Sequence, residues 1–215
     1  MPASSRRVAW LRAGERALFV VAAVALAWYA GVRIEASREQ EALSRELDRA
    51  SAALAVTQPA PRAGDRTSGR QPARPVPAPR DVIGRIEVPR LRLSVVAREG
   101  VDTRTLRGAA GHVPGSALPG EPGNAAFAAH RDTFFAPLRD VRKGDGVTVT
   151  TPQGEYHYVV ASTQIVDPDD VAVLDPTKDA TLTLVTCYPF DYFGSAPQRF
   201  IVRARLAESA AARVE

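Results

Sequence analysis

Residues 59–80 divide the chain into two parts that must fold by different means. This segment, PAPRAGDRTSGRQPARPVPAPR, contains six prolines, five arginines and no large aromatic residue. Such a composition cannot bury a hydrophobic core, so we expect an extended, disordered linker. A globular domain must then form from residues 81–207, which leaves residues 208–215 as a C-terminal tail.

The basic charge of the chain lies before this domain. Residues 1–80 contain 13 arginines against 7 acidic residues, whereas residues 81–215 contain 15 Lys+Arg against 17 Asp+Glu. The slightly acidic domain offers no electrostatic footprint for a phosphate backbone, so a nucleic-acid partner is not expected. The single cysteine excludes an internal disulfide framework and a zinc site built from several cysteines.

The most hydrophobic segment is ALFVVAAVALAWYAGV, from Ala17 to Val32, which has sixteen residues and no charge. Arginines flank it on both sides, and Trp28 and Tyr29 suit a membrane interface. We interpret residues 17–33 as a transmembrane anchor in contact with membrane lipid. A cleaved secretory signal, with its shorter apolar region, is the main alternative, and a buried core helix is another.

The charges before this segment predict its orientation. Four arginines precede it with Glu15 as the only acid among them: Arg6, Arg7, Arg12 and Arg16. Under the positive-inside rule residues 1–16 stay in the cytoplasm. We therefore expect a single-pass protein of the plasma membrane whose domain is extracytoplasmic.

Residues 34–58 are rich in Glu, Arg, Ala and Leu and read as a helical stalk. Leu43, Leu47 and Leu54 could mark a weak coiled-coil seam. The stretch is short for a coiled coil, so a solvated stalk is favoured.

From Asp81 onward, short apolar runs alternate with Gly, Pro and Asp, which predicts strands and turns. Seven strands are expected, at Ile83–Val88, Leu93–Ala97, Ala125–Ala129, Gly146–Thr151, Glu155–Val166, Leu182–Thr186 and Arg199–Leu206. Seven or eight strands in a domain of this size favour a closed barrel, which leaves no exposed edge. The predicted fold class is mainly β, with short helices.

The one cysteine, Cys187, follows the apolar strand TLTLVT and opens an irregular loop. Reactive side chains often occupy such positions, although many free cysteines are simply buried small hydrophobes. Among the three histidines, position favours His130 as its base, because His130 also ends an apolar strand. His157 reads as a structural residue on a barrel face, and His112 as a turn residue with a minor option of lining a substrate groove.

Arg199 begins the last predicted strand, twelve residues after Cys187. A guanidinium near a thiol can lower the thiol pKa and donate hydrogen bonds to an oxyanion. Taken alone, Arg199 could equally be a surface charge.

These segments resemble the sortase family. TLTLVTCYPFDYFGSAPQRF fits the T-L-x-T-C…R signature, NAAFAAHRDTFFAPLRDVRKGD matches the histidine segment, and the stretch from GRIEVPRLRL to LPGEPGN follows the N-terminal half. The likeness spans about residues 82–206 and is greatest to class D sortases. One departure is Ala129, where many relatives have glycine, a change that could tighten the groove wall.

The resemblance implies an eight-stranded sortase barrel and a cysteine transpeptidase that needs no cofactor and no metal. It implies catalytic roles for His130, Cys187 and Arg199, and contributions to substrate binding from Thr186, His112 and Ala129. The expected partners are secreted proteins with a C-terminal L-P-x-T-x sorting motif. The expected acceptor is an amine, from a peptidoglycan peptide or a pilin lysine.

Other functions are compatible with some of the same residues. An extracytoplasmic cysteine peptidase or an L,D-transpeptidase would also pair cysteine with histidine, and a membrane-tethered binding module would leave the barrel catalytically unused. LPGEPG at residues 118–123 superficially resembles a sorting motif, but it lacks threonine and lies within the domain. The chain therefore reads as the enzyme rather than as a sorted substrate.

Overall fold

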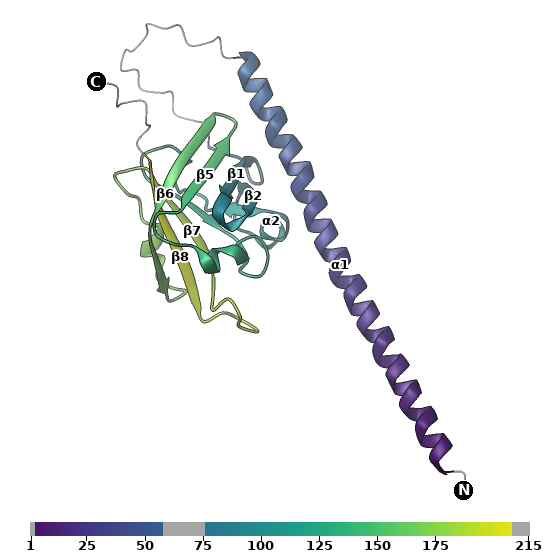
Figure 1. Cartoon of the computed structure of the whole chain (residues 1–215). Coiled ribbons are helices and arrows are strands. Elements are labelled where there is room, and N and C mark those ends of the chain that lie inside the picture. The colour runs from purple at the N-terminus through teal and green to yellow at the C-terminus, as the bar shows by residue number, and fades with distance from the viewer. Residues whose placement is uncertain (1–2, 58–75, 208–215) are drawn as a thin grey trace, which may run out of the picture. The chain divides into compact units, whose positions relative to one another are not determined.

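The structure, a computed structural model, describes residues 3–57 and 76–207. Most of the predicted linker and all of the predicted C-terminal tail lie outside the described residues. The first described element is one continuous helix, α1 (Ala3–Thr57) (Figure 1). This helix runs without interruption through the predicted cytoplasmic, anchor and stalk segments.

No helix within residues 3–57 and 76–207 combines the length and the apolar character that membrane crossing requires. Residues up to Glu41 form one structural unit, and residues from Ala42 onward form another. The end of α1 belongs to the second unit, where Leu43 and Leu47 are both 2% exposed. Leu43 clusters with Val96 and Ala109. The prediction of a fully solvated stalk is therefore wrong for these two leucines.

The second unit contains a closed eight-stranded barrel, as the strand count predicts. Its strands run around the barrel in the order β1-β2-β3-β4-β7-β8-β6-β5. Their bounds are β1 (Val82–Val88), β2 (Leu93–Glu99), β3 (Ala110–His112), β4 (Asn124–Ala128), β5 (Gly146–Thr151), β6 (Gly154–Val166), β7 (Thr181–Tyr188) and β8 (Gln198–Leu206). All seven predicted strands are confirmed, and β3 is the strand that the sequence pattern missed.

Short helices occupy four of the connections between strands. They are η1 (Pro89–Leu91), α2 (Thr103–Gly108), η2 (Ala136–Asp140) and η3 (Val171–Leu174). The carboxylate of Asp102 caps α2 by accepting hydrogen bonds from the backbone N–H groups of Arg104 and Thr105. The helix η3 lies in the long connection between β6 and β7.

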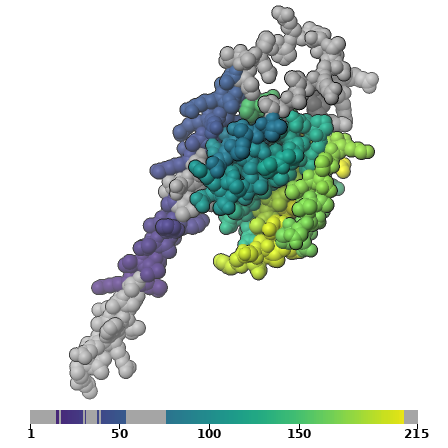
Figure 2. Space-filling view, turned by 180° about the vertical axis from the view of Figure 1, so that it is seen from behind, coloured from purple at the N-terminus to yellow at the C-terminus, as the bar shows by residue number. Residues whose placement is uncertain are grey.

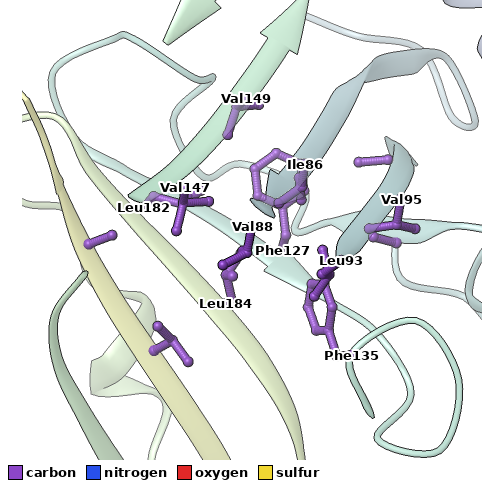
Figure 3. Close-up of a cluster of buried hydrophobic side chains, with 14 of the residues drawn as sticks. Ile86, Val88, Leu93, Val95, Phe127, Phe135, Val147, Val149, Leu182 and Leu184 are labelled. Carbon is purple, nitrogen blue, oxygen red and sulfur yellow. The ribbon is translucent and has the colours of Figure 1, made fainter. Parts of the chain in front are cut away.

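The interior of the barrel is apolar because alternate residues of each strand point inward. Figure 3 shows these side chains converging from several strands, with Ile86, Phe127, Leu182 and Leu184 among them. Inward positions on β7 are therefore Leu182 and Leu184, so Thr183, Val185 and Cys187 face outward. This alternation decides which side chains can meet at the site.

Candidate active site

Cys187 and Arg199 face each other on the outer surface of the barrel. β7 and β8 pair antiparallel, and Cys187 is directly opposite Arg199 in their register. Both residues alternate with inward core residues, so their side chains leave the same face of the sheet. Residues directly opposite in such a pair have Cβ atoms about 5 Å apart. Cys187 and Arg199 thus begin from neighbouring Cβ positions on a half-buried part of the surface.

His130 reaches the same place from the other side of β7. β4 and β7 pair in parallel with Ala128 beside Val185. The backbone N–H of Ala129 still donates to the carbonyl oxygen of Val185, at 3.2 Å, so the ladder extends beyond β4. Two residues further along both strands, the same register places the exposed residue His130 beside Cys187. The two strand ends predicted from sequence do meet.

Arginines fix the connection between β7 and β8 next to these residues. Arg199 donates through Nη1 to the carbonyl oxygens of Ala196 and Gln198, at 3.2 and 3.0 Å. Arg131, the residue after His130, donates to the carbonyl oxygens of Tyr192 and Gly194. The loop after Cys187 is therefore tied to the end of β4 by a side chain adjacent to His130.

A cavity of about 650 Å³ opens beside this loop. Its aromatic lining includes Tyr188, Phe190 and Phe200, whose rings contact one another with centroids 5.4 to 6.2 Å apart. Arg139 crosses the Phe190 ring at 5.5 Å and forms an ion pair with Asp191 at 3.2 Å. The residues immediately after Cys187 thus form one wall of a hollow at that end of the barrel.

Thr186 and Ala129 point away from the outer face, unlike Cys187. Ala129 belongs to the apolar core and is 6% exposed, and Thr186 is 2% exposed. The hydroxyl of Thr186 donates to the carbonyl oxygen of Ala129 at 2.7 Å. Neither side chain lines an outer groove in this arrangement. Thr186 instead links the backbone just before His130 to the strand that carries Cys187.

His112 also faces inward, and it is 1% exposed. Its Nδ1 lies 2.6 Å from Oε2 of Glu99, and its Nε2 lies 2.9 Å from the carbonyl oxygen of Ala117. The ring contacts Phe127 in the core with centroids 5.1 Å apart. The sequence allowed His112 to be a turn residue that lines a substrate groove. The structure instead makes His112 the last residue of β3, where it is buried and both of its ring nitrogens have hydrogen-bonding partners. His112 is thus not at the surface that carries Cys187.

Three polar residues on the outer face were not identified from the sequence. They are Asn124 on β4, Thr183 on β7 and Arg203 on β8. Asn124 and Arg203 donate hydrogen bonds to the carbonyl oxygen of Val173, in the connection between β6 and β7, and Thr183 donates to Oδ1 of Asn124. The sequence pattern that could have indicated them is a polar residue at an outward position of an otherwise apolar strand. Within the described parts of the chain, no group of three or more His, Cys, Asp or Glu residues is placed to hold a metal ion.

Comparisons with known proteins agree with this geometry. The sortase domain profile matches residues 86–207. A Sortase D from Bacillus subtilis (strain 168) is 32% identical over 191 residues, which cover 86% of this chain and 94% of that protein. A Sortase A from Listeria monocytogenes is 36% identical over 110 residues, or 49% of each chain. The match to Sortase D thus extends over more of the chain, in accord with the predicted class D likeness.

Solved structures of sortases share the barrel. A Clostridium perfringens Sortase D5 transpeptidase superimposes with a TM-score of 0.55 at 28% identity, covering 60% of this chain and 80% of that one. The Listeria monocytogenes sortase A gives a TM-score of 0.54 at 31% identity, with 59% and 88% covered. Together with the profile match over most of the barrel, these likenesses establish that the chain belongs to the sortase family of cysteine transpeptidases.

Proposed function

We propose that Cys187, His130 and Arg199 are the catalytic residues and that they act on an L-P-x-T-x sorting motif. The observation that carries this proposal is their placement on one outer face at neighbouring strand ends, with Cys187 opposite Arg199. The small, half-buried residues Ala128 and Val185 lie on the same face beside them. An extended peptide laid over these two residues would present its scissile bond to Cys187.

The chemistry then proceeds in two balanced steps. The Cys187 thiolate attacks the threonine carbonyl carbon, and the negative charge on the carbonyl oxygen is stabilised by the Arg199 guanidinium. The C–N bond breaks as the protonated His130 donates its proton to the departing amine, which leaves a thioester. An incoming amine attacks that thioester, His130 takes its proton, and the Cys187 sulfur is released.

We further propose that α1 anchors the enzyme at the membrane, with the barrel outside the cytoplasm. The helix exposes large apolar side chains throughout its uncharged segment, where Leu18, Phe19, Val24, Leu26 and Trp28 are 64 to 77% exposed. An exposed apolar surface of this size is typical of a surface that meets lipid or protein. Arginines before the segment favour a cytoplasmic N-terminus.

The proposed substrates and acceptors follow from the same site. The substrate would be a secreted protein whose sorting motif lies near its C-terminus. The acceptor would be an amine of the cell envelope, either on a peptidoglycan peptide or on a pilin lysine. Transfer to water alone would instead make the enzyme a peptidase, so the fate of the thioester distinguishes the two activities.

Incubation of the full chain with an L-P-x-T-x peptide and a primary amine tests the proposal. We expect mass spectrometry to detect an acyl-enzyme on Cys187 and a ligated peptide product. Cys187→Ala should abolish both. Arg199→Ala should still bind peptide but lose about 10²–10³-fold in turnover, as removal of an oxyanion donor does elsewhere.

The matched control for Arg199 is Arg205→Ala, because Arg205 is an exposed arginine on the same face of the same strand. Its turnover should remain near that of the unmodified enzyme. Full ligation by Cys187→Ala, or equal losses in the two arginine variants, would contradict the assignment.

A further inference from the structure

One strand of the closed barrel runs past its neighbour and leaves part of its own edge unpaired. The pairing of β6 with the β5 side ends at Val160, which accepts a hydrogen bond from Gly144 and donates one to Asp145, at 2.8 and 2.9 Å. Residues 162–166 continue alongside β8 and pair with no other described strand (Figure 1). The expectation that barrel closure leaves no exposed edge is therefore wrong for this part of β6.

The backbone groups of Thr163 and Ile165 point to this open edge. On β8, the backbone N–H of Leu206 donates to the residue that precedes β7. Backbone groups alternate in direction along a strand, so those of Val202 and Phe200 also point to β7. Thr163 and Ile165 lie opposite these two residues in the register, so their N–H and C=O groups cannot bond to β8. No other hydrogen bond within the described part of the chain reaches them.

This edge lacks the features that usually prevent one sheet from pairing with another. Residues 161–166 read ASTQIV, with no charge and no proline. The irregularity in the β6 register lies between Val160 and Ser162, so the strand is regular from Ser162 onward. Residues 162–165 are all exposed. Such an edge can accept a further strand.

A second copy of the same edge fits the open length. If a two-fold axis passes between the Gln164 residues of two antiparallel copies, Thr163 of each copy lies opposite Ile165 of the other. Both of these pairs can exchange two hydrogen bonds, because all the groups involved face the edge. Val166 then lies opposite Ser162, and the added strand must end there, because the turn before β5 occupies the next position.

Opposite charges meet at both ends of this arrangement. Three exposed aspartates follow β6, at Asp167, Asp169 and Asp170. The connection that they begin lies at the surface, beside the yellow C-terminal strands (Figure 2). The turn before β5 carries the exposed side chains of Arg142 and Lys143. Since the added strand ends at this turn, the aspartates of each copy come next to the basic pair of the other, which favours a second copy as the occupant.

We propose that this chain forms a two-fold symmetric dimer by antiparallel pairing of the open β6 edges. Val166, Arg199 and Cys187 lie in one row across β6, β8 and β7. At about 4.8 Å between strands, Cys187 lies about 10 Å from the paired edge, so the dimer leaves it open. The two-fold axis sets both catalytic faces on the same side of the joined sheet. Association and the proposed peptide chemistry are therefore separable.

Disulfide trapping tests the register of this interface. Cys187→Ala removes the only native cysteine, so Gln164→Cys can be added to it as a single probe. The two Gln164 residues form a non-hydrogen-bonded pair with Cα atoms about 4.5 Å apart, within reach of a disulfide. The full chain in detergent micelles, under mild oxidation, should therefore give a disulfide-linked dimer.

Two further cysteine variants in the same background provide the controls. Ser162→Cys is also exposed, but its two copies would be about 13 Å apart along the strands, so it should cross-link at least about tenfold more slowly than Gln164→Cys. An equimolar mixture of Ser162→Cys and Val166→Cys should cross-link efficiently, because these positions face each other across the axis.

A proline on the open edge tests the hydrogen bonds. Thr163→Pro removes an N–H that faces the edge, and it leaves the pairing with β8 in place. Two interface bonds are lost by symmetry, so the dissociation constant of the dimer should rise at least about tenfold in sedimentation velocity experiments. Thr163→Ala keeps the N–H and is the matched control.

A charge exchange tests the ends of the interface independently. Asp167→Lys and Lys143→Glu should each weaken the dimer several-fold, and the two changes combined in one chain should restore it, because every contact again joins opposite charges. Lys178→Glu changes an exposed lysine away from the edge and should have little effect.

The outcomes separate this inference from the proposed function. A full chain that stays monomeric at about 100 µM, above the dissociation constants of weak specific dimers, would overturn the dimer. A dimer in which Gln164→Cys cross-links no faster than Ser162→Cys would place the contact on another surface and overturn the β6 interface. Absence of peptide ligation would overturn the proposed function alone. If Thr163→Pro does not fold, the cysteine variants still decide.

Discussion

Two histidines illustrate how orientation separates structural from chemical roles. Nε2 of His112 must carry a hydrogen, because it lies 2.9 Å from the carbonyl oxygen of Ala117, which can only accept. The Ser116 hydroxyl beside it already donates to Val113, at 2.7 Å. Nδ1 is hydrogen-bonded to the buried Glu99 carboxyl, 2.6 Å away. His112 thus completes an internal network, whereas His130 stands exposed beside Cys187.

Alanine substitutions of the two histidines should therefore have opposite effects. His112→Ala leaves the buried Glu99 carboxyl unpaired and should lower the free energy of unfolding by about 3–5 kcal/mol, as breaking buried pairs does. His130→Ala should change unfolding little but reduce ligation about 10²–10⁴-fold. Urea denaturation and peptide ligation on both variants measure this contrast. A ligation defect in folded His112→Ala as large as that of His130→Ala would contradict the separation.

The catalytic candidates could be predicted from sequence because each lies at the end of an apolar strand. The substrate-binding candidates could not, since their role depends on which face they occupy. Thr186 follows the alternation of Leu182 and Leu184, which places it inward with Ala129. Counting that alternation outward from the core would have assigned Thr186 to the interior. No local pattern, however, reveals that Asn124 and Thr183 meet, because they are 59 residues apart in the chain.

At the scale of elements, the positions of the strands in the sequence could be predicted, but the pairing partners of each strand in the barrel could not. Alternation of apolar and polar residues located seven strands within a few residues, but β3 has only three residues and carries no periodic pattern. The parallel pairing of β4 with β7 brings His130 to Cys187, and it joins segments separated by two other strands in sequence. Long-range pairing of this kind depends on barrel closure rather than on local preference.

One ion pair links the short helices η1 and η2 to the turn before β5. Arg90, in η1, binds the Asp145 carboxylate through Nε and Nη2 at 2.5 and 2.6 Å, and also donates to the carbonyl oxygen of Asp140 at the end of η2. Asp145 precedes β5 and is nearly buried. The Arg90 hydrogen bond, with the backbone N–H of Arg142, lowers the pKa of Asp145 below its usual value. Ionised Asp145 is therefore favoured in the folded state.

This lowered pKa predicts how stability responds to acid. The unfolded carboxyl titrates near pH ~3.9, so the contribution of Asp145 is fully present above that pH. It is lost as the pH falls through the lower folded pKa, because the folded state then takes up the proton. Arg90→Gln should destabilise the protein at neutral pH, and the difference from the unmodified chain should shrink below about pH 4. Urea denaturation across that range measures it.

The control for this prediction is Lys143→Gln, which removes an exposed positive charge two residues before Asp145. It should change the acid dependence of unfolding far less than Arg90→Gln. A difference between Arg90→Gln and the unmodified chain that stays constant from neutral pH to acid would contradict the role given to Asp145.

At the scale of the whole molecule, the division of charge and the proline-rich segment predict a domain that begins at residue 81. The first strand, β1, begins at Val82, and the unit that contains the barrel also includes the end of α1 from Ala42. The sequence did not reveal that α1 continues through three predicted segments, because helix propensity is high on both sides of the apolar stretch. Nor did it show that Leu43 and Leu47 become buried, which depends on a surface formed by distant residues.

The apolar segment of α1 gives the last prediction, which concerns where the enzyme works. Exposed Val21 and Val24 lie within the uncharged stretch, so the full chain should float with vesicles containing anionic lipid. Val21→Glu with Val24→Glu should abolish flotation, because two carboxylates in hydrocarbon are strongly unfavourable. Ala42→Glu with Ala52→Glu adds the same charges to exposed positions of the same helix and should leave flotation unchanged. Ligation of a soluble peptide should be equal in all three proteins, since the proposed catalytic residues lie on the barrel. Equal flotation of the two double variants would refute membrane attachment through this segment without affecting the assignment of Cys187.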